Sequence, residues 1–297
     1  MDKKRLFLCS LVIFVLIFIG SLTKELYCSD VGPENGYLVI VGGAMKDPAI
    51  FKHFMKLAGG PEAPVVIIPT AGGAEHYGQN WRGLRQFQES GFKNLTLLHS
   101  YDRSKSNSEE FIQPLKEARA VFFTGGRQWR LADAYLNTQV HHELFSLLER
   151  GGVIGGSSAG ATIQGSYLVR GDTKTNTIMM GDHTEGMGFL KNTGIDQHLI
   201  KRNRQFDLLE VIEAHPHLLG IGIDENTAII VHGDHFEVIG QGYVAIYDST
   251  KYIPPSGPFY FLAPGDRFNL KTRQALRPTR IFKPLDRIQS KKKSKTN

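Results

Sequence analysis

A serine in a stretch of small residues is the first position in this sequence that could do chemistry. Residues 156–160 read GSSAG and match the pattern G-x-S-x-G, with Ser158 at the centre, directly after an apolar run. In such an elbow between a strand and a helix, the flanking glycines let the backbone pack closely and the central hydroxyl projects clear of the sheet. The backbone N–H of Ala159, at the expected helix start, could then stabilise an oxyanion. A helix N-cap formed by Ser157 or Ser158 would explain the serines nearly as well.

A nucleophilic serine needs a base, and histidine is the usual one at neutral pH. Several of the eleven histidines fall in expected helices, hairpins or loops. His198 differs, because it follows a short apolar stretch and precedes a basic segment at 201–204 that we expect to be helical, which places it near a strand end. Both cysteines, Cys9 and Cys28, lie in or beside the N-terminal leader, so the nucleophile of the folded part must be oxygen or nitrogen.

The elements that must position these residues alternate along the chain. Apolar runs typical of strands buried on both faces occur at 37–41, 64–69, 95–98, 120–123 and 152–155, and helical patterns at 50–57, 77–90, 108–117, 128–136 and 139–150. This alternation predicts an α/β fold with a doubly wound, mostly parallel sheet flanked by helices, of the flavodoxin-like or class I glutamine amidotransferase-like type. Such sheets bind ligands at the carboxyl ends of their strands.

Three of the predicted strands end in glycine pairs, at 42–43, 72–73 and 125–126. Glycine supplies positive φ in short turns, and the three pairs would place permissive backbone on one sheet edge. None of them fits G-x-G-x-x-G or a P-loop, so nucleotide binding is not supported. Further along, 228–231 and 236–239 predict a hairpin around 232–235, with 243–247 as a third strand.

Composition sets the domain organisation. A chain of 297 residues with 41% hydrophobic and 22% charged residues is typical of a globular protein. We expect a leader over 1–30, one domain over 36–250, and an irregular C-terminal extension with a basic tail over 251–297. The net charge of +6 is concentrated in the basic clusters at 3–5 and 291–295, so we expect solvated tails and no nucleic-acid partner.

The leader resembles a secretory signal. A basic start precedes an apolar run from Leu6 to Ile19, which is short for a membrane-spanning helix. No clear A-x-A cleavage site follows, so an uncleaved anchor is the alternative. We therefore expect a secreted or periplasmic protein whose membrane association, if any, is through this segment only.

Five ordered segments carry a resemblance to a known family. They are 125–128 (GGRQ), 156–161 (GSSAGA), 196–198 (DQH), 202–204 (RNR) and 220–228 (GIGIDENTA). Together, from about Gly36 to Asp248, the chain resembles the cyanophycinase branch of the serine peptidases related to dipeptidase E. The resemblance implies that Ser158 is the nucleophile and His198 the general base. It also implies no metal and no organic cofactor.

The same resemblance suggests further site residues. It makes the backbone N–H of Gly126 an oxyanion donor beside that of Ala159, and it places Arg127 and Gln128 in contact with the substrate. The carboxylate of Glu225 would either bind a basic substrate group or belong to a turn, and we favour the turn.

The acid of the expected triad is less clear from the sequence. The resemblance places an Asp or Glu between the serine and the histidine, and Asp172, Asp182 and Glu185 are the candidates. We prefer Asp172, because it follows the hydrophobic segment 167–169 near the serine. A salt bridge from Asp172 to Arg170 or Lys174 is the competing interpretation.

These residues favour hydrolysis of a peptide or isopeptide bond. By resemblance the substrate is cyanophycin, a poly-aspartate chain bearing arginine on its side carboxylates, which an exopeptidase cuts to β-aspartyl-arginine dipeptides. One alternative is an α/β-hydrolase esterase, although that fold usually places its histidine far downstream of the serine, whereas His198 is 40 residues after Ser158. Another is a non-catalytic secreted binding protein on the same fold. A homodimer is left open.

Overall fold

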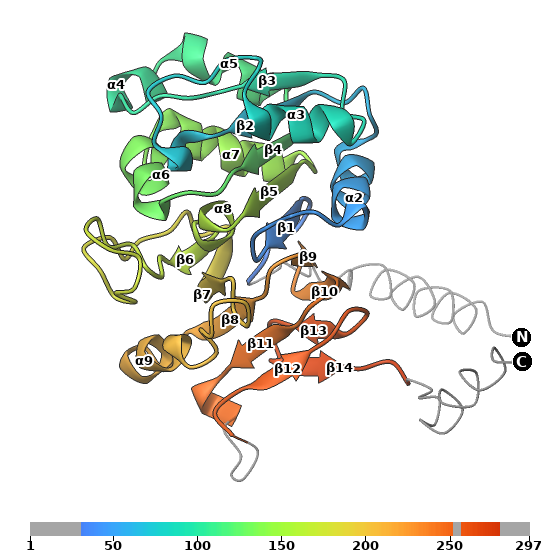
Figure 1. The fold of residues 1–297 in the computed structure, drawn as a ribbon, viewed down its shortest axis with the longest axis vertical. Helices are drawn as coiled ribbons and strands as arrows, with labels where there is room; N and C mark the ends of the chain where they lie inside the picture. Colours follow the sequence, from blue (N-terminus) through green and yellow to red (C-terminus); the bar gives the residue numbers. More distant parts are fainter. Residues whose placement is uncertain (1–30, 252–256, 280–297) are drawn as a thin grey trace, which may run out of the picture.

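A mixed sheet of nine strands forms the centre of the protein. The computed structural model describes residues 31–251 and 257–279. Five parallel strands lie side by side in the order β1 (Tyr37–Val41), β5 (Val153–Ser157), β4 (Ala120–Phe123), β2 (Val65–Ile68) and β3 (Leu95–Leu97). The antiparallel strands β9 (Thr227–His232), β10 (His235–Gly240), β13 (Arg267–Asn269) and β14 (Gln274–Leu276) extend the sheet beyond β1. The predicted α/β sheet and the 228–239 hairpin are therefore confirmed (Figure 1).

Helices cover both faces of the parallel strands. On one face Val39 and Val41 of β1 pack into a core with α2 (Pro48–Ala58) and α3 (Arg82–Glu89). On the other face Leu38 and Ile40 pack into a core with α5 (Glu109–Glu117), α6 (Gln128–Tyr135), α7 (Gln139–Glu149) and the short α8 (Ala159–Thr162). Successive side chains of a strand point to opposite faces, so burial on both sides requires the unbroken apolar runs seen in the sequence.

A second sheet packs beside the first. Its five strands run in the order β12 (Tyr260–Leu262), β11 (Val244–Tyr247), β8 (Leu219–Ile223), β7 (Leu190–Gln197) and β6 (Gly165–Tyr167), with α9 (Asp207–Ala214) against it. In Figure 1 the helix-covered parallel strands occupy the upper half of the molecule, and β8, β11 and β12 the lower half. Strands β7 and β8 are parallel and in register, with Gln197 opposite Ile223. Residues 198 and 224–225 therefore leave neighbouring strands at the same edge.

Four sequence predictions are wrong in detail. The third strand expected beside the hairpin is β11, which pairs with β8 in the second sheet. The extension after 250 is not irregular, because its described part forms three short strands: β12 pairs with β11 in the second sheet, and β13 and β14 extend the first sheet beyond β10. The helix expected over 77–90 begins only at Arg82. The basic segment 201–204 forms turns, with Asn203 at a left-handed φ of 55°.

The predicted leader at 1–30 and the basic tail at 291–295 lie outside the described residues. Within the described ranges, every helix is too short or too polar to cross a bilayer.

Candidate active site

Ser158 occupies the corner between β5 and α8. Its backbone N–H donates to the carbonyl oxygen of Val41 at the end of β1, at 3.0 Å, and its φ of 57° lies in the left-handed region. Ser158 is the N-cap of α8 by position, but its side chain makes no capping hydrogen bond to the helix, so capping does not explain its hydroxyl. Non-glycine residues adopt such a φ only where the surrounding structure holds them there, which fits a hydroxyl fixed at a strained elbow.

The two glycines of the motif allow the corner to close. A Cβ on Gly156 would lie 2.0 Å from the carbonyl oxygen of Gly160, and a Cβ on Gly160 would lie 2.1 Å from that of Phe123. Neither contact leaves room for a side chain. The small residues thus bring β5, α8 and the end of β4 together around Ser158.

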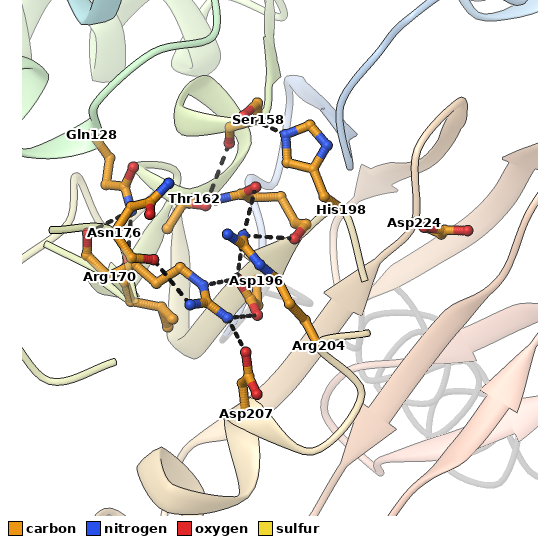
Figure 2. Close-up of polar contacts among 12 residues, drawn as sticks. Gln128, Ser158, Thr162, Arg170, Asn176, Asp196, His198, Arg204, Asp207 and Asp224 are labelled. Carbon is orange, nitrogen blue, oxygen red and sulfur yellow. Dashed lines mark hydrogen bonds and ion pairs between the residues drawn. The ribbon is translucent and has the colours of Figure 1, made fainter. Parts of the chain in front are cut away.

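His198 lies beside this hydroxyl. Its Nε2 is 2.9 Å from Ser158 Oγ (Figure 2). Its backbone N–H donates to the carbonyl oxygen of Gly42 at 2.8 Å, and its ring packs on Gly43, where a Cβ would lie 2.3 Å from His198 Cε1. The structure therefore brings together the serine and the histidine that the sequence selected, and the glycine pair after β1 makes the space for the ring.

Glu225 completes the row of hydrogen bonds. Its Oε1 lies 2.7 Å from His198 Nδ1, so the carboxylate accepts the Nδ1–H and leaves Nε2 to accept from the serine hydroxyl. From the sequence we expected Glu225 to belong to a turn or to contact the substrate, so its role as the acid was missed. A signal was present, because Glu225 follows the strand β8 and falls in one of the five ordered segments.

Asp172 does not hold the position predicted for it. Its Oδ1 accepts from the backbone N–H groups of Lys174 and Thr175, at 2.9 and 2.6 Å, and so shapes its own loop. The two other candidates are also elsewhere, since Asp182 binds Thr173 and Glu185 bridges to the backbone of Tyr167. The family resemblance suggested an acid before His198, whereas the pairing of β7 with β8 supplies one after it.

The loop after β4 lies against the nucleophile. A Cβ on Gly125 would be 3.3 Å from Ser158 Cβ, and Gly126 follows with a φ of 148° that favours glycine. Ala159 is the first residue of α8, so its N–H has no partner within the helix. The backbones of both predicted oxyanion donors, Gly126 and Ala159, are thus close to the hydroxyl.

Gln128 and Arg127 serve the protein's own backbone. Gln128 is buried, and its Nε2 donates to the carbonyl oxygens of Val169 and Arg170 at 2.9 and 2.7 Å. Arg127 Nη2 donates to the carbonyl oxygens of Asp172, at 2.8 Å, and Thr175. These side chains therefore hold the 169–175 segment against the loop, and their substrate contacts stay a prediction.

Comparison with known proteins decides the family. The sequence profile of Peptidase family S51 matches residues 38–239. The chain belongs to this family. Curated relatives of the S51 peptidase include the cyanophycinase of Geminocystis herdmanii, 31% identical over 260 residues that cover 80% of this chain and 95% of the relative. The cyanophycinase of a Nostoc species is also 31% identical, over 80% of this chain and 87% of its own.

Solved structures agree with the fold. A peptidase from an acI-B1 Actinobacterium superposes with a TM-score of 0.63 at 25% identity, covering 80% of this chain and 98% of the other. A putative peptidase E protein from Listeria monocytogenes superposes with a TM-score of 0.52 at 18% identity, covering 70% of this chain and 99% of the other. At this identity the likeness supports the fold alone. The protein is thus an α/β peptidase of family S51.

A buried ion-pair network supports the histidine of this S51 peptidase. Asp196, fully buried two residues before His198, accepts two hydrogen bonds from Arg170, at 2.8 and 2.9 Å (Figure 2). Arg170 also pairs with Asp207, and Arg204 Nη1 donates to the backbone and side-chain oxygens of Gln197 at 3.2 Å. These contacts hold the end of β7 and the turn that follows it. His198 lies between the two. From the sequence we considered an ion pair of Arg170 with Asp172, but Arg170 pairs with Asp196 and Asp207. Nothing else in the sequence indicated this network.

Replacing Arg170 with methionine is expected to lower the free energy of unfolding by about 3–5 kcal/mol, because the buried carboxylate of Asp196 loses both of its hydrogen bonds from Arg170 and keeps, among the described residues, only the 3.9 Å contact with Arg204. Urea unfolding of the two proteins measures this difference. Arg267→Met is the matched control: Arg267 pairs with Glu237 at the surface, and its loss should cost less than about 1 kcal/mol. Equal effects of the two changes would contradict a structural role for the network.

The protonation state of His198 suits a base. Burial lowers the pKa of His198 below its ordinary value of 6.5, Glu225 opposes the shift, and the charges of Arg202 and Arg204 add to it. The imidazole is therefore neutral at pH 7 and able to accept a proton.

We expect the acid limb of the kcat/KM profile to have its midpoint below pH 6.5, since activity is lost as His198 protonates. Arg202→Gln removes a positive charge that lowers this pKa, so it should move the midpoint to higher pH. Lys201→Gln, an equal charge change at the neighbouring exposed residue, should move it less. A shift of the Arg202→Gln midpoint to lower pH would refute this account.

Proposed function

We propose that this S51 peptidase is a serine exopeptidase that cleaves cyanophycin-like polymers of aspartate and arginine to β-aspartyl-arginine dipeptides. The observation that carries the reaction type is the continuous row of hydrogen bonds from Ser158 through His198 to Glu225. The 31% identity to cyanophycinases over 80% of the chain supports the substrate class.

The geometry is suited to acyl transfer to water. Ser158 Oγ gives its proton to His198 Nε2 and bonds to the substrate carbonyl carbon, while Glu225 stabilises the imidazolium. The N–H groups of Gly126 and Ala159 would stabilise the oxyanion. His198 then protonates the leaving amine as the C–N bond breaks. Water, deprotonated by His198, attacks the acyl ester and releases the carboxylic acid and free Ser158.

The substrate is tested with the purified protein and insoluble cyanophycin. Mass spectrometry of the soluble products should show β-aspartyl-arginine dipeptides released from chain ends. Longer fragments at early times would contradict the exopeptidase mode. Inertness toward cyanophycin, with retained labelling by a fluorophosphonate probe, would overturn the substrate and leave a serine hydrolase.

We also propose that the protein is exported, on the strength of the sequence at 1–30 alone. Mass measurement of the mature protein from the native cell envelope and medium tests this and reports whether the leader is removed. Recovery of the full-length chain from the cytoplasm alone would contradict export.

A further inference from the structure

A guanidinium group that has no acidic partner among the described residues lies beside the loop that follows β4. Arg130, in the first turn of α6, donates from Nη1 to the carbonyl oxygen of Ala71 at 3.1 Å, and its guanidinium lies 5.2 Å from the ring of Trp129. In the part of the chain that the structure describes, no carboxylate oxygen lies within 4.0 Å of it. Arg130 is partly exposed, so it is held in place yet accessible to a ligand.

The carbonyl of Ala71 ties Arg130 to the loop beside the nucleophile. This oxygen also accepts from the Arg127 N–H at 2.8 Å, and a Cβ on Gly126 would lie 2.0 Å from it. Ala71 belongs to η1 (Thr70–Gly72), the turn that follows β2. Arg130 also packs over the next residue, since a Cβ on Gly73 would lie 2.2 Å from Nη1. The guanidinium is thus placed at the carboxyl end of β2.

The strand order puts Arg130 and His198 on opposite sides of Ser158. His198 packs on Gly43 after β1, Ser158 follows β5, the 125–126 loop follows β4, and Arg130 lies at the end of β2. His198 must protonate the leaving amine, so the leaving group lies on the β1 side. The side of β4 and β2, where Arg130 lies, is then left for the carbonyl oxygen and the acyl part of the substrate.

The same segment contains buried polar groups without a hydrogen-bond partner. Among the described residues, Arg127 Nε and Trp129 Nε1 are buried N–H groups with no acceptor, and the hydroxyl of Thr124 is also unpaired. Buried donors are normally satisfied, and leaving one unpaired is unfavourable because the group has lost its hydrogen bonds to water. A ligand rich in acceptor oxygens suits this side of the site better than a basic or apolar one.

We infer that Arg130 is a specificity-determining residue that binds a carboxylate on the acyl side of the scissile bond. Arginine presents a planar fork of donors that matches a carboxylate, and such charge-assisted pairs are the stronger hydrogen bonds in proteins. This inference rests on the proposed hydrolysis by Ser158. In the proposed polymer, the group bound would be the free α-carboxylate of the arginine on the acyl-side aspartate.

The test uses covalent labelling of Ser158 by diphenyl phosphonates, which need no knowledge of the full substrate. One pair of probes derives from aspartate and asparagine, so that only the side-chain carboxylate differs. A second pair carries β-linked arginine on the acyl-side aspartate, with its α-carboxyl group free or amidated. Labelling rates are measured by intact-protein mass for the wild type, Arg130→Gln, Arg130→Lys and Arg119→Gln. Arg119 is an exposed arginine just before β4, at the opposite end of that strand, and so controls for the charge change.

For the wild type and Arg119→Gln, we expect the carboxylate form of at least one pair to label about tenfold faster than its amide. The ratio should fall toward one in Arg130→Gln and recover in part in Arg130→Lys. A faster rate for the aspartate probe than for the asparagine probe would identify the bound group as the aspartate side-chain carboxylate. A faster rate for the free α-carboxyl probe than for its amide would identify it as the carboxylate of the β-linked arginine. If the carboxylate and amide probes of both pairs labelled the wild type at equal rates, or if Arg130→Gln kept the preference for the carboxylate, the inference would be overturned and the proposed hydrolysis would stand. No labelling by any probe would overturn the proposed hydrolysis, and the inference with it.

Discussion

Ser158→Ala is expected to lower kcat on the proposed substrate cyanophycin by at least about 10⁴-fold, because removing the nucleophile of a serine hydrolase leaves only binding and oxyanion stabilisation. The structure strengthens this expectation, since Ser158 Oγ already lies 2.9 Å from His198 Nε2. Release of arginine-containing dipeptides, followed over hours at high enzyme concentration, measures the residual rate.

Ser157→Ala is the matched control for this change. Ser157 is the last residue of β5 and is also half-buried, but the hydrogen bond to the imidazole comes from its neighbour. We expect Ser157→Ala to change kcat by less than about tenfold, as a substitution outside the reacting groups should. If both variants were equally inactive, the loss would be due to damage at the corner and not to the missing hydroxyl.

Glu225→Gln is expected to lower kcat by about 10⁴-fold with little change in KM, because an amide cannot stabilise the imidazolium and can favour the wrong tautomer. The prediction depends on the 2.7 Å contact between Glu225 Oε1 and His198 Nδ1. Steady-state kinetics on the same substrate separate kcat from KM.

Asp172→Asn provides the decisive comparison with the acid that the sequence preferred. The turn at Asp172 uses one side-chain oxygen as an acceptor, which asparagine retains. We expect kcat within about tenfold of the wild type. A collapse of activity in Asp172→Asn with normal activity in Glu225→Gln would restore the first assignment and refute the triad described here.

Much of the architecture could be predicted from patterns local in the chain. The runs at 37–41 and 120–123 are apolar throughout because both faces of these strands are covered, and they became β1 and β4. The C-terminal segment was harder, because strands of three residues such as β13 and β14 carry too short a pattern to distinguish from loops.

The pair Ser158 and His198 was accessible from the sequence because each lies in a short motif at the end of a strand. The role of Gln128 was not, since an amide that could contact a substrate is buried against the carbonyls of Val169 and Arg170. A short motif places a residue on an edge, but it does not say which way the side chain turns.

The sequence by itself determined the parallel α/β core and the glycine-rich corner that carries Ser158, because hydrophobic periodicity and such corners are local properties of a chain. Spacing made His198 a candidate, and the family resemblance selected it as the base. Only the tertiary structure decided the acid. Asp172 is closer to Ser158 in sequence, but the parallel pairing of β7 with β8 brings Glu225 to the imidazole. The same holds for the Arg170 and Asp196 pair, whose members are 26 residues apart and meet only when β7 is buried. Strand pairing joins distant segments through backbone hydrogen bonds, so the contacts that it creates leave no periodic trace in the sequence.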